Sequence, residues 1–228
     1  MVDHRTTVTH GIRLAYDVSG PDQGPPVVLL HALGEDARSW RAVSSVLAAK
    51  WRVYAVDLRG HGRSEWPGRY SLELMTADTL GFLDALELPR VDLVGHSLGG
   101  VVAYTLAQDQ PDRVARLVLE DAPAPLPREP VAPVRPEGVL GFDWDVVTAV
   151  RPQLDRPEPG RLDRLDRISA ETLVVAGGPA SHISQEGVAE LTRRIPHARQ
   201  ITLPVGHMIH DRAPGDFTRA VAEFLAAP

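Results

Sequence analysis

The chain has 228 residues and a formal net charge of −6, with 43% apolar and 24% charged residues. That length predicts one domain over residues 1–228, large enough to bury a sheet with helices on both faces. The negative charge argues against a nucleic-acid partner, because phosphate binding needs a basic surface. The absence of cysteine excludes disulfides, thiol nucleophiles and thiolate metal sites.

No stretch of the sequence approaches the ~18 unbroken apolar residues of a membrane helix. The first ten residues, MVDHRTTVTH, lack the apolar core of a secretory signal. The lack of cysteine is consistent with a reducing compartment. We therefore expect a cytoplasmic protein without a membrane partner, acting on a small-molecule substrate as a monomer or a homodimer.

Predicted strands and helices alternate along most of the chain. Two short strands are expected on either side of a turn at His10 and Gly11. Apolar runs predict buried strands at 25–34, 51–64, 91–97, 115–123, 171–178 and 198–206, and helical spacing predicts helices at 37–49, 71–86, 98–108, 185–195 and 214–226. This alternation predicts an α/β fold with a mostly parallel twisted sheet and helices on both faces.

Residues 123–165 interrupt the alternation. Nine of the chain's 20 prolines fall in this segment, too many for a central strand or a long helix, and only FDWDVVTAVRPQL is compatible with a short helix. The segment leaves from the carboxyl end of a strand, where α/β sheets bind their ligands. We therefore expect a short proline-rich cap over a pocket. A proline-rich surface loop without a role is the alternative.

A serine between glycines lies where a predicted strand meets a predicted helix. Gly95, His96, Ser97, Leu98 and Gly99 match the pattern G-x-S-x-G, in the strand–turn–helix context that a nucleophile elbow requires. Such a turn exposes the serine hydroxyl as a nucleophile. The alternative is a helix N-cap, a position that serine also favours.

Together with other segments, this motif resembles the α/β-hydrolase fold superfamily, and the likeness covers nearly the whole chain. HALG at 31–34 is similar to the family's oxyanion loop, although Ala32 replaces the more usual glycine. DLRGHGRS at 57–64 and VGHMIH at 205–210 resemble its turn after the next strand and its histidine segment. The resemblance implies a serine hydrolase similar to small esterase and lactonase-type members. It also implies an oxyanion hole made by the backbone N–H groups of Leu33 and Leu98.

His207 is the predicted general base. It follows the last predicted strand directly, so that it can reach over the sheet edge toward Ser97, take the serine proton and return it to the leaving group. His210, three residues further on, is the competing candidate.

The predicted acid departs from the common family pattern. Many members carry an aspartate after the strand that corresponds to 171–178, but here Ser181 stands in that region. Asp121, at the tip of the preceding strand, is the predicted acid, because a histidine base needs an acceptor that fixes its tautomer. Glu120 is expected to point away from it, since successive strand side chains alternate. If Asp121 instead caps a turn, Glu186 or water would support the histidine.

The pocket is expected to accept a small, fairly apolar acyl group. Its predicted lining comes from the cap and from histidines near strand ends: His31, Leu140, Phe142, Trp144 and His182. No histidine and carboxylate ligands cluster at short spacing, so neither a metal site nor a cofactor is predicted.

The predicted function is that of a cofactor-free serine hydrolase. It would cleave a small-molecule ester, lactone or amide through an acyl-enzyme on Ser97. One alternative is a non-hydrolytic enzyme of the same fold, such as a cyclase, a lyase or an enzyme that cleaves a C–C bond. Another is a small-molecule receptor with slow turnover.

Overall fold

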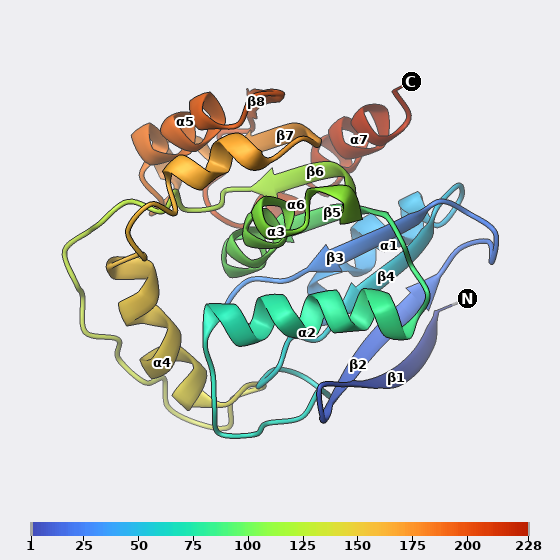
Figure 1. Cartoon of the computed structure of the whole chain (residues 1–228), viewed down its shortest axis with the longest axis horizontal. Coiled ribbons are helices and arrows are strands. Elements are labelled where there is room, and N and C mark those ends of the chain that lie inside the picture. Colours follow the sequence, from blue (N-terminus) through green and yellow to red (C-terminus); the bar gives the residue numbers. More distant parts are fainter. Residues whose placement is uncertain (1, 228) are drawn as a thin grey trace.

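The structure, a computed structural model, describes residues 2–227 and is built on an eight-stranded sheet (Figure 1). Its strands are β1 (Asp3–Thr9), β2 (Ile12–Ser19), β3 (Pro26–Leu30), β4 (Arg52–Val56), β5 (Val91–His96), β6 (Val114–Glu120), β7 (Glu171–Ala176) and β8 (Ala198–Thr202). Their order across the sheet is β1-β2-β4-β3-β5-β6-β7-β8. The β1–β2 and β2–β4 pairs are antiparallel and all the other pairs are parallel, as the sequence predicts.

The first two strands form the predicted hairpin. His10 and Gly11, which connect them, both have a positive φ, of 49° and 77°. A two-residue turn with both residues in the left-handed region matches the right-handed twist of the strands that it joins. The hairpin therefore extends the edge of the sheet beyond β4.

Helices cover both faces of the sheet, as predicted. One apolar cluster packs α2 (Leu72–Ala85), α3 (Leu98–Asp109) and α5 (Gln185–Arg194) against the sheet. A second cluster packs α1 (Arg41–Leu47) and α7 (Pro214–Leu225) against the opposite face. The predicted helix at 37–49 is divided, because the 3₁₀ turn η1 (Ala37–Trp40) precedes α1. Short turns complete the chain: η2 (Pro111–Arg113), η3 (Asp163–Arg167), η4 (Gly178–Ala180) and α6 (Ile209–Arg212).

The segment 123–165 holds one helix, α4 (Trp144–Asp155), which confirms that only a short helix forms there. In Figure 1, α4 stands apart from the other helices, on the side to which the arrowheads of β3 and β6 point. Hydrogen bonds fix both ends of this helix. The Tyr70 hydroxyl donates to Asp143 over 2.6 Å, and the Arg128 N–H donates to the carbonyl of Asp155 over 2.9 Å. The segment therefore lies at the carboxyl ends of the central strands.

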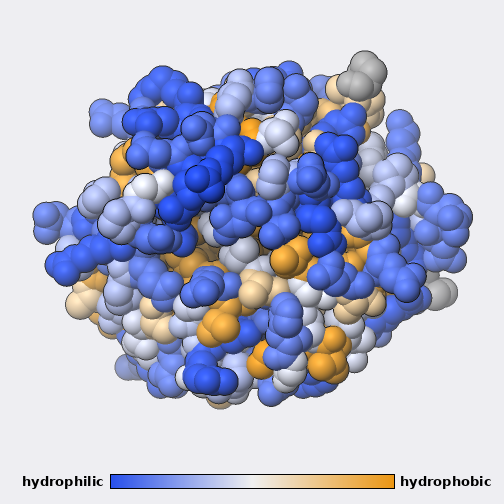
Figure 2. Space-filling model, in the orientation of Figure 1, coloured by the Kyte–Doolittle hydropathy of each residue, from blue (hydrophilic) through white to orange (hydrophobic). Residues whose placement is uncertain are grey.

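The face of the molecule shown in Figure 2 is mostly hydrophilic, with apolar residues scattered over it. Scattered apolar side chains are ordinary on a folded surface. Within residues 2–227, no helix has both the length and the apolar character needed to cross a membrane.

Candidate active site

Ser97 lies at a sharp turn between β5 and α3. Its backbone has φ 51° and ψ −110°, a conformation that costs about 1–3 kcal/mol and persists only when its surroundings impose it. A Cβ on Gly95 would lie 2.4 Å from the carbonyl oxygen of Gly99, and a Cβ on Gly99 would lie 2.2 Å from that of Leu30. The motif therefore needs both glycines, because β5, α3 and β3 approach each other too closely for side chains.

The side chain of Ser97 does not cap α3. No backbone N–H of the helix donates to it, so the N-cap interpretation of this serine is wrong. Ser97 lines a cavity of about 470 Å³ at the carboxyl ends of the strands. That volume lies in the range of small-molecule sites. The turn thus presents the hydroxyl to a space that a small ligand can fill.

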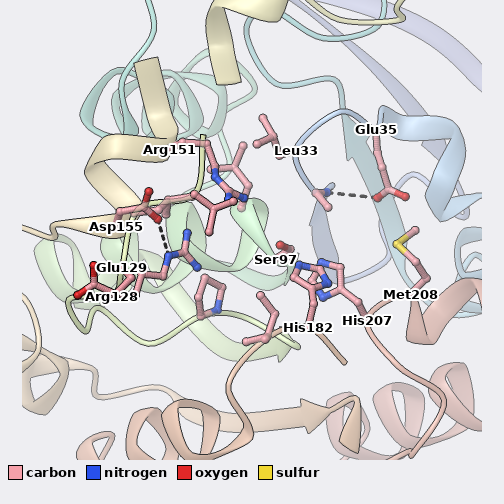
Figure 3. A pocket seen from close by; sticks show the side chains of 16 residues that line it. Leu33, Glu35, Ser97, Arg128, Glu129, Arg151, Asp155, His182, His207 and Met208 are labelled. Carbon is pink, nitrogen blue, oxygen red and sulfur yellow. Dashed lines mark hydrogen bonds and ion pairs between the residues drawn. The ribbon is translucent and has the colours of Figure 1, made fainter. Parts of the chain in front are cut away.

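His207 and Ser97 line the same cavity (Figure 3). Nδ1 of His207 lies 2.8 Å from Oδ2 of Asp121. Because an ionised carboxylate only accepts, Nδ1 carries the proton and Nε2 is left with the lone pair that a base needs. The structure therefore brings together the three residues predicted from the sequence. His210, the competing histidine, is buried and does not line this cavity.

Four donors surround the buried carboxylate of Asp121. Besides His207, they are the N–H of Gly177 at 2.9 Å, the amide of Gln185 at 3.2 Å and the hydroxyl of Ser181. Burial acts to raise the pKa of Asp121, but the hydrogen bonds from His207, Ser181, Gly177 and Gln185 outweigh it and lower that pKa. Asp121 is therefore held as the anion, and a turn-capping role alone does not account for its partners.

Ser181 and Gln185 were not predicted as site residues. Ser181 occupies the region after β7 where many family members carry the acid, and here it donates to the acid that β6 supplies. The position of Ser181 after this strand could have marked it as a site residue, but the sequence alone did not show with which carboxylate it would form a hydrogen bond. Glu186, the alternative acid, has no side-chain hydrogen bond within residues 2–227 and does not line the cavity.

Leu33, in the loop after β3, and Leu98, at the start of α3, both line the cavity. Within residues 2–227, neither backbone N–H donates to a protein acceptor. Leu98 is the first residue of α3, so its N–H has no partner inside the helix. Two backbone donors are thus available near Ser97 for a developing oxyanion.

His31 was predicted to line the pocket, and the structure contradicts this. Its side chain is fully buried. Nδ1 donates to the carbonyl of Ala32 over 2.8 Å, and Nε2 accepts from the N–H of Leu58 over 3.0 Å. His31 therefore ties together the loops that follow β3 and β4.

Leu140, Phe142 and Trp144 also do not line the cavity, which corrects a second prediction. Phe142 forms an isolated antiparallel bridge with His61 and stacks on its ring at a centroid distance of 5.6 Å. Trp144 begins α4 and lies near Phe142, with ring centroids 6.5 Å apart. This part of the segment packs on the loop after β4, because the chain pairs there before it enters α4.

His182 does line the cavity, as predicted. Its ring lies across that of His207, with centroids 4.2 Å apart and an interplanar angle of 65°. Desolvation and the nearby His207 lower the pKa of His182, so it is neutral near pH 7. A neutral imidazole beside the base can donate or accept one hydrogen bond to a ligand.

The lining of the cavity includes charged side chains that the sequence analysis did not predict. Five of the side chains that line it carry charge: Glu35, Arg128, Glu129, Arg151 and Asp155. Nε of Arg128 donates to Asp155 over 2.6 Å, an ion pair that Figure 3 shows at the α4 side of the cavity. These charged groups lie beside apolar ones such as Leu33, Leu154 and Ile183, so the pocket combines an apolar wall with charged side chains. Nothing in the local sequence pattern distinguishes these arginines from surface arginines.

Comparison with known families identifies the family to which the chain belongs. A family model described as the alpha/beta hydrolase fold matches residues 25–154, more than half of its length. The chain therefore belongs to the α/β hydrolase fold family. The matched segment includes the elbow at Ser97 and the predicted acid Asp121.

Curated relatives match either about half of the chain or nearly all of it. A putative carbamate hydrolase of Variovorax paradoxus is 45% identical over 112 residues, which are 48% of this chain and 42% of that protein. An uncharacterized protein of Mycobacterium tuberculosis is 40% identical over 50% of this chain and 33% of its own. The chain thus spans between a third and half of the length of these relatives. An sn-1-specific diacylglycerol lipase of Xenopus laevis is 26% identical over 98% of the chain and 87% of that protein.

Solved structures match over the whole fold. An esterase from Thermogutta terrifontis has a TM-score of 0.81 and 29% identity, covering 99% of this chain and 98% of its own. The enol-lactonase from Burkholderia xenovorans has a TM-score of 0.85 and 22% identity, covering 98% of this chain and 100% of its own. At that identity the lactonase shows a shared fold and no more.

Proposed function

We propose that the protein is a cofactor-free serine hydrolase that cleaves a small-molecule ester, lactone or amide. Ser97 is the nucleophile, His207 the general base and Asp121 the acid that orients it. One observation carries this proposal: Nδ1 of His207 is hydrogen-bonded to Asp121 over 2.8 Å, and His207 lines the same cavity as Ser97. The other ring nitrogen of His207, Nε2, is therefore the one that can take and return the serine proton.

Acylation follows from this arrangement. The Ser97 hydroxyl attacks the carbonyl carbon, forming an O–C bond, while Nε2 of His207 takes its proton. The N–H groups of Leu33 and Leu98 stabilise the oxyanion that develops. When the tetrahedral intermediate collapses, the bond to the leaving group breaks and His207 returns the proton to it. Asp121 stabilises the imidazolium in between.

Deacylation repeats the same steps with water. His207 takes a proton from a water molecule as that water attacks the acyl carbon, and then gives the proton back to Ser97. The carboxylic acid is released and the enzyme is restored. The cavity of about 470 Å³ and the charged side chains in its lining favour a small substrate that carries polar groups over a long acyl chain.

The relatives support hydrolysis as the reaction class. Those named above include a putative carbamate hydrolase and a lipase, and the solved structures include an esterase at 29% identity. A second candidate is non-hydrolytic chemistry in the same cavity. It is supported by a putative 2-succinyl-6-hydroxy-2,4-cyclohexadiene-1-carboxylate synthase of Bacillus subtilis, which is 37% identical over 50% of this chain.

The test is intact mass after treatment with a fluorophosphonate, together with turnover of p-nitrophenyl acetate. We expect one adduct on the wild type and none on Ser97→Ala, with turnover reduced at least ~10³-fold in that variant. Ser45→Ala, an exposed serine on α1, is the matched control and keeps both properties. A folded wild type that forms no adduct and does not turn over esters contradicts the proposal and favours a receptor or the non-hydrolytic candidate.

A further inference from the structure

Two buried histidines outside the proposed triad each leave one ring nitrogen unpaired. They are His96, the last residue of β5, and His210 in α6, both with side chains at most 1% exposed. Nδ1 of His96 and Nε2 of His210 have no hydrogen-bond partner within residues 2–227. Unpaired polar atoms this deeply buried are costly and need an explanation.

The other nitrogen of each ring determines the tautomer. Nδ1 of His210 lies 2.9 and 2.8 Å from the two carboxylate oxygens of Glu120, which also accepts from the backbone N–H of His210 over 2.8 Å. A carboxylate in this role accepts, so Nδ1 of His210 carries the proton. Nε2 of His96 lies 3.0 Å from the carbonyl oxygen of His207 and must donate to it. In their neutral forms, both unpaired nitrogens therefore present lone pairs.

A carboxylate completes the cluster. Oε2 of Glu35, in the loop after β3, lies 3.4 Å from Nδ1 of His96. One ligand atom from each of Glu35, His96 and His210 lies within 4.8 Å of the other two. Three acceptors thus converge. The N–H of Ala32 donates to Oε2 of Glu35 over a long 3.4 Å, but within residues 2–227 no protein donor meets either of the two imidazole nitrogens. Such an arrangement is satisfied by a cation.

We propose that Glu35, His96 and His210 form a binding site for a divalent transition-metal ion of the Zn²⁺ class. Two imidazoles and one carboxylate are ligands that this class of ion prefers, with bonds of about 2.0–2.2 Å. Adjacent ligands of a tetrahedral ion are then ~3.4 Å apart, which is the separation between His96 and Glu35.

The surroundings of both histidines match those of metal ligands. Histidine ligands usually donate their other ring N–H to a carboxylate or a backbone carbonyl, which fixes the tautomer and raises the basicity of the ligating nitrogen. Glu120 provides the carboxylate for His210, and the His207 carbonyl provides the acceptor for His96. Glu35 also lines the cavity (Figure 3), so an ion in the cavity could reach the site at this side chain.

A proton is the competing occupant. A proton on Nδ1 of His96 would satisfy that nitrogen and Glu35, but it would leave Nε2 of His210 without a partner. A divalent ion satisfies all three atoms at once. The site goes beyond the proposed hydrolysis and does not depend on it, because none of its three ligands takes part in the steps described above.

A bound ion would fasten three segments of the cavity wall. Glu35 follows Leu33 in the oxyanion loop, His96 precedes Ser97, and His210 follows His207 on the histidine segment. The ion would therefore stabilise the arrangement of these loops. A bound ion can therefore be detected through the metal content and the thermal stability of the protein, independently of its activity.

The test uses the full chain, treated with a chelator and then dialysed against Zn²⁺. We expect one zinc per chain by elemental analysis, and an unfolding midpoint that rises with zinc concentration as linkage requires. His210→Asn and Glu35→Gln should each weaken zinc binding at least ~10-fold. Co²⁺ supplies a second readout, because its visible absorption bands report ligand number and type.

His197→Asn is the matched control, because His197 is an exposed histidine outside the cluster. It should bind zinc like the wild type. The proposal is overturned if the wild type binds no more zinc than His210→Asn, or if His197→Asn loses as much binding. If His210→Asn does not fold, Glu35→Gln decides the question, since Glu35 lies on the cavity wall and is not part of the core. Unweakened binding by a folded Glu35→Gln also overturns it.

Discussion

The hydroxyl of Ser181 donates a hydrogen bond to the carboxylate of Asp121, joining the turn after β7 to the tip of β6. The same carboxylate oxygen, Oδ2, lies 2.8 Å from Nδ1 of His207. The region after β7, which many family members use for the acid itself, therefore supports an acid supplied by the neighbouring strand. This relationship leads to two predictions.

Ser181→Ala should weaken the support of Asp121 without removing the acid. The loss of a hydrogen bond to a charged group costs about 1.5–3 kcal/mol. Because Ser181 is one of the groups that lower the pKa of Asp121, that pKa should rise in the variant. A carboxylate whose pKa is lowered by folding stabilises the folded state at pH values above its pKa in the unfolded chain. This stabilisation is lost as the pH falls through the lowered pKa of the folded state.

Urea unfolding at pH 7 and at pH 3 measures this effect. The difference between wild type and Ser181→Ala should be larger at pH 7 and smaller at pH 3. Ser184→Ala removes a nearby serine whose hydroxyl caps α5 and does not contact Asp121, so it controls for loss of a hydroxyl. Equal destabilisation by Ser181→Ala at both pH values would show that its contact with Asp121 does not depend on the charge.

Asp121→Asn should reduce kcat for an ester substrate by on the order of 10³–10⁴, because an amide cannot stabilise the imidazolium and favours the wrong tautomer of His207. Addition of Ser181→Asp to this variant should recover part of the activity. The Ser181 hydroxyl already lies within hydrogen-bond distance of Asp121 Oδ2, the oxygen that meets His207.

Steady-state kinetics on the single and double variants measure this recovery. Ser184→Asp in the Asp121→Asn background is the control, since position 184 caps α5 and does not meet His207. Recovery by both aspartates would mean that a general change in charge is responsible. Full activity of Asp121→Asn alone would remove Asp121 from the proposed triad.

The sequence predicts most of the fold because the signals for it are local. Apolar runs mark β3 and β5, and the spacing of apolar residues marks α2 and α7. The elbow at Ser97 is equally local, because strand, glycines and helix are adjacent in the sequence. The roles of Ser97, His207 and Asp121 stay predictions until variants are measured.

The pocket lining could not be predicted in the same way. It depends on the path of residues 123–165, and a proline-rich segment has no periodicity from which to read a buried face. Phe142 looks like a pocket residue in the sequence, yet its partner is His61. The cluster of Glu35, His96 and His210 was also beyond reach, because its members come from three distant parts of the chain and short spacing was the only available sign of a metal site.

His61 should make the free energy of unfolding depend on pH, in the range between the pKa of His61 in the unfolded chain and its pKa in the folded protein. It accepts from the N–H of Gly34 at Nε2 over 3.2 Å and donates from Nδ1 to the carbonyl of Arg59 over 3.0 Å. The bond from Gly34 requires a neutral ring, because a protonated Nε2 cannot accept, and burial lowers the pKa of His61 to about 3. The unfolded chain binds a proton below about pH 6.5 and the folded chain does not. Stability is therefore full above pH 6.5 and falls by up to about 1.4 kcal/mol per pH unit toward pH 3.

Urea unfolding at pH 7, 6 and 5 tests this dependence. His61→Gln should be less stable than wild type at pH 7, and the two should converge as the pH falls, because the variant has no proton to gain at this position. His10→Gln is the control, since His10 lies in the β1–β2 turn. Parallel stability curves for wild type and His61→Gln would contradict the prediction.

Gly95→Ala should damage both the fold and the elbow. Its Cβ would lie 2.4 Å from the carbonyl oxygen of Gly99 and within 2.6 Å of the backbone N of Gly100, and backbone atoms cannot move aside as a flexible side chain can. Overpacking of this kind costs about 1–3 kcal/mol or more. Since the strain can be relieved only by moving α3 away from β5, Ser97 should shift with it, and the folded fraction should lose activity as well.

Gly215→Ala is the matched substitution, because nothing lies within 4 Å of its Cβ and it is near the start of α7. That control should be neutral or stabilise the protein by up to about 1 kcal/mol. Thermal unfolding and ester turnover per folded molecule separate the two effects: a stable and fully active Gly95→Ala would mean that the elbow tolerates a side chain and that close backbone approach is not what fixes Ser97.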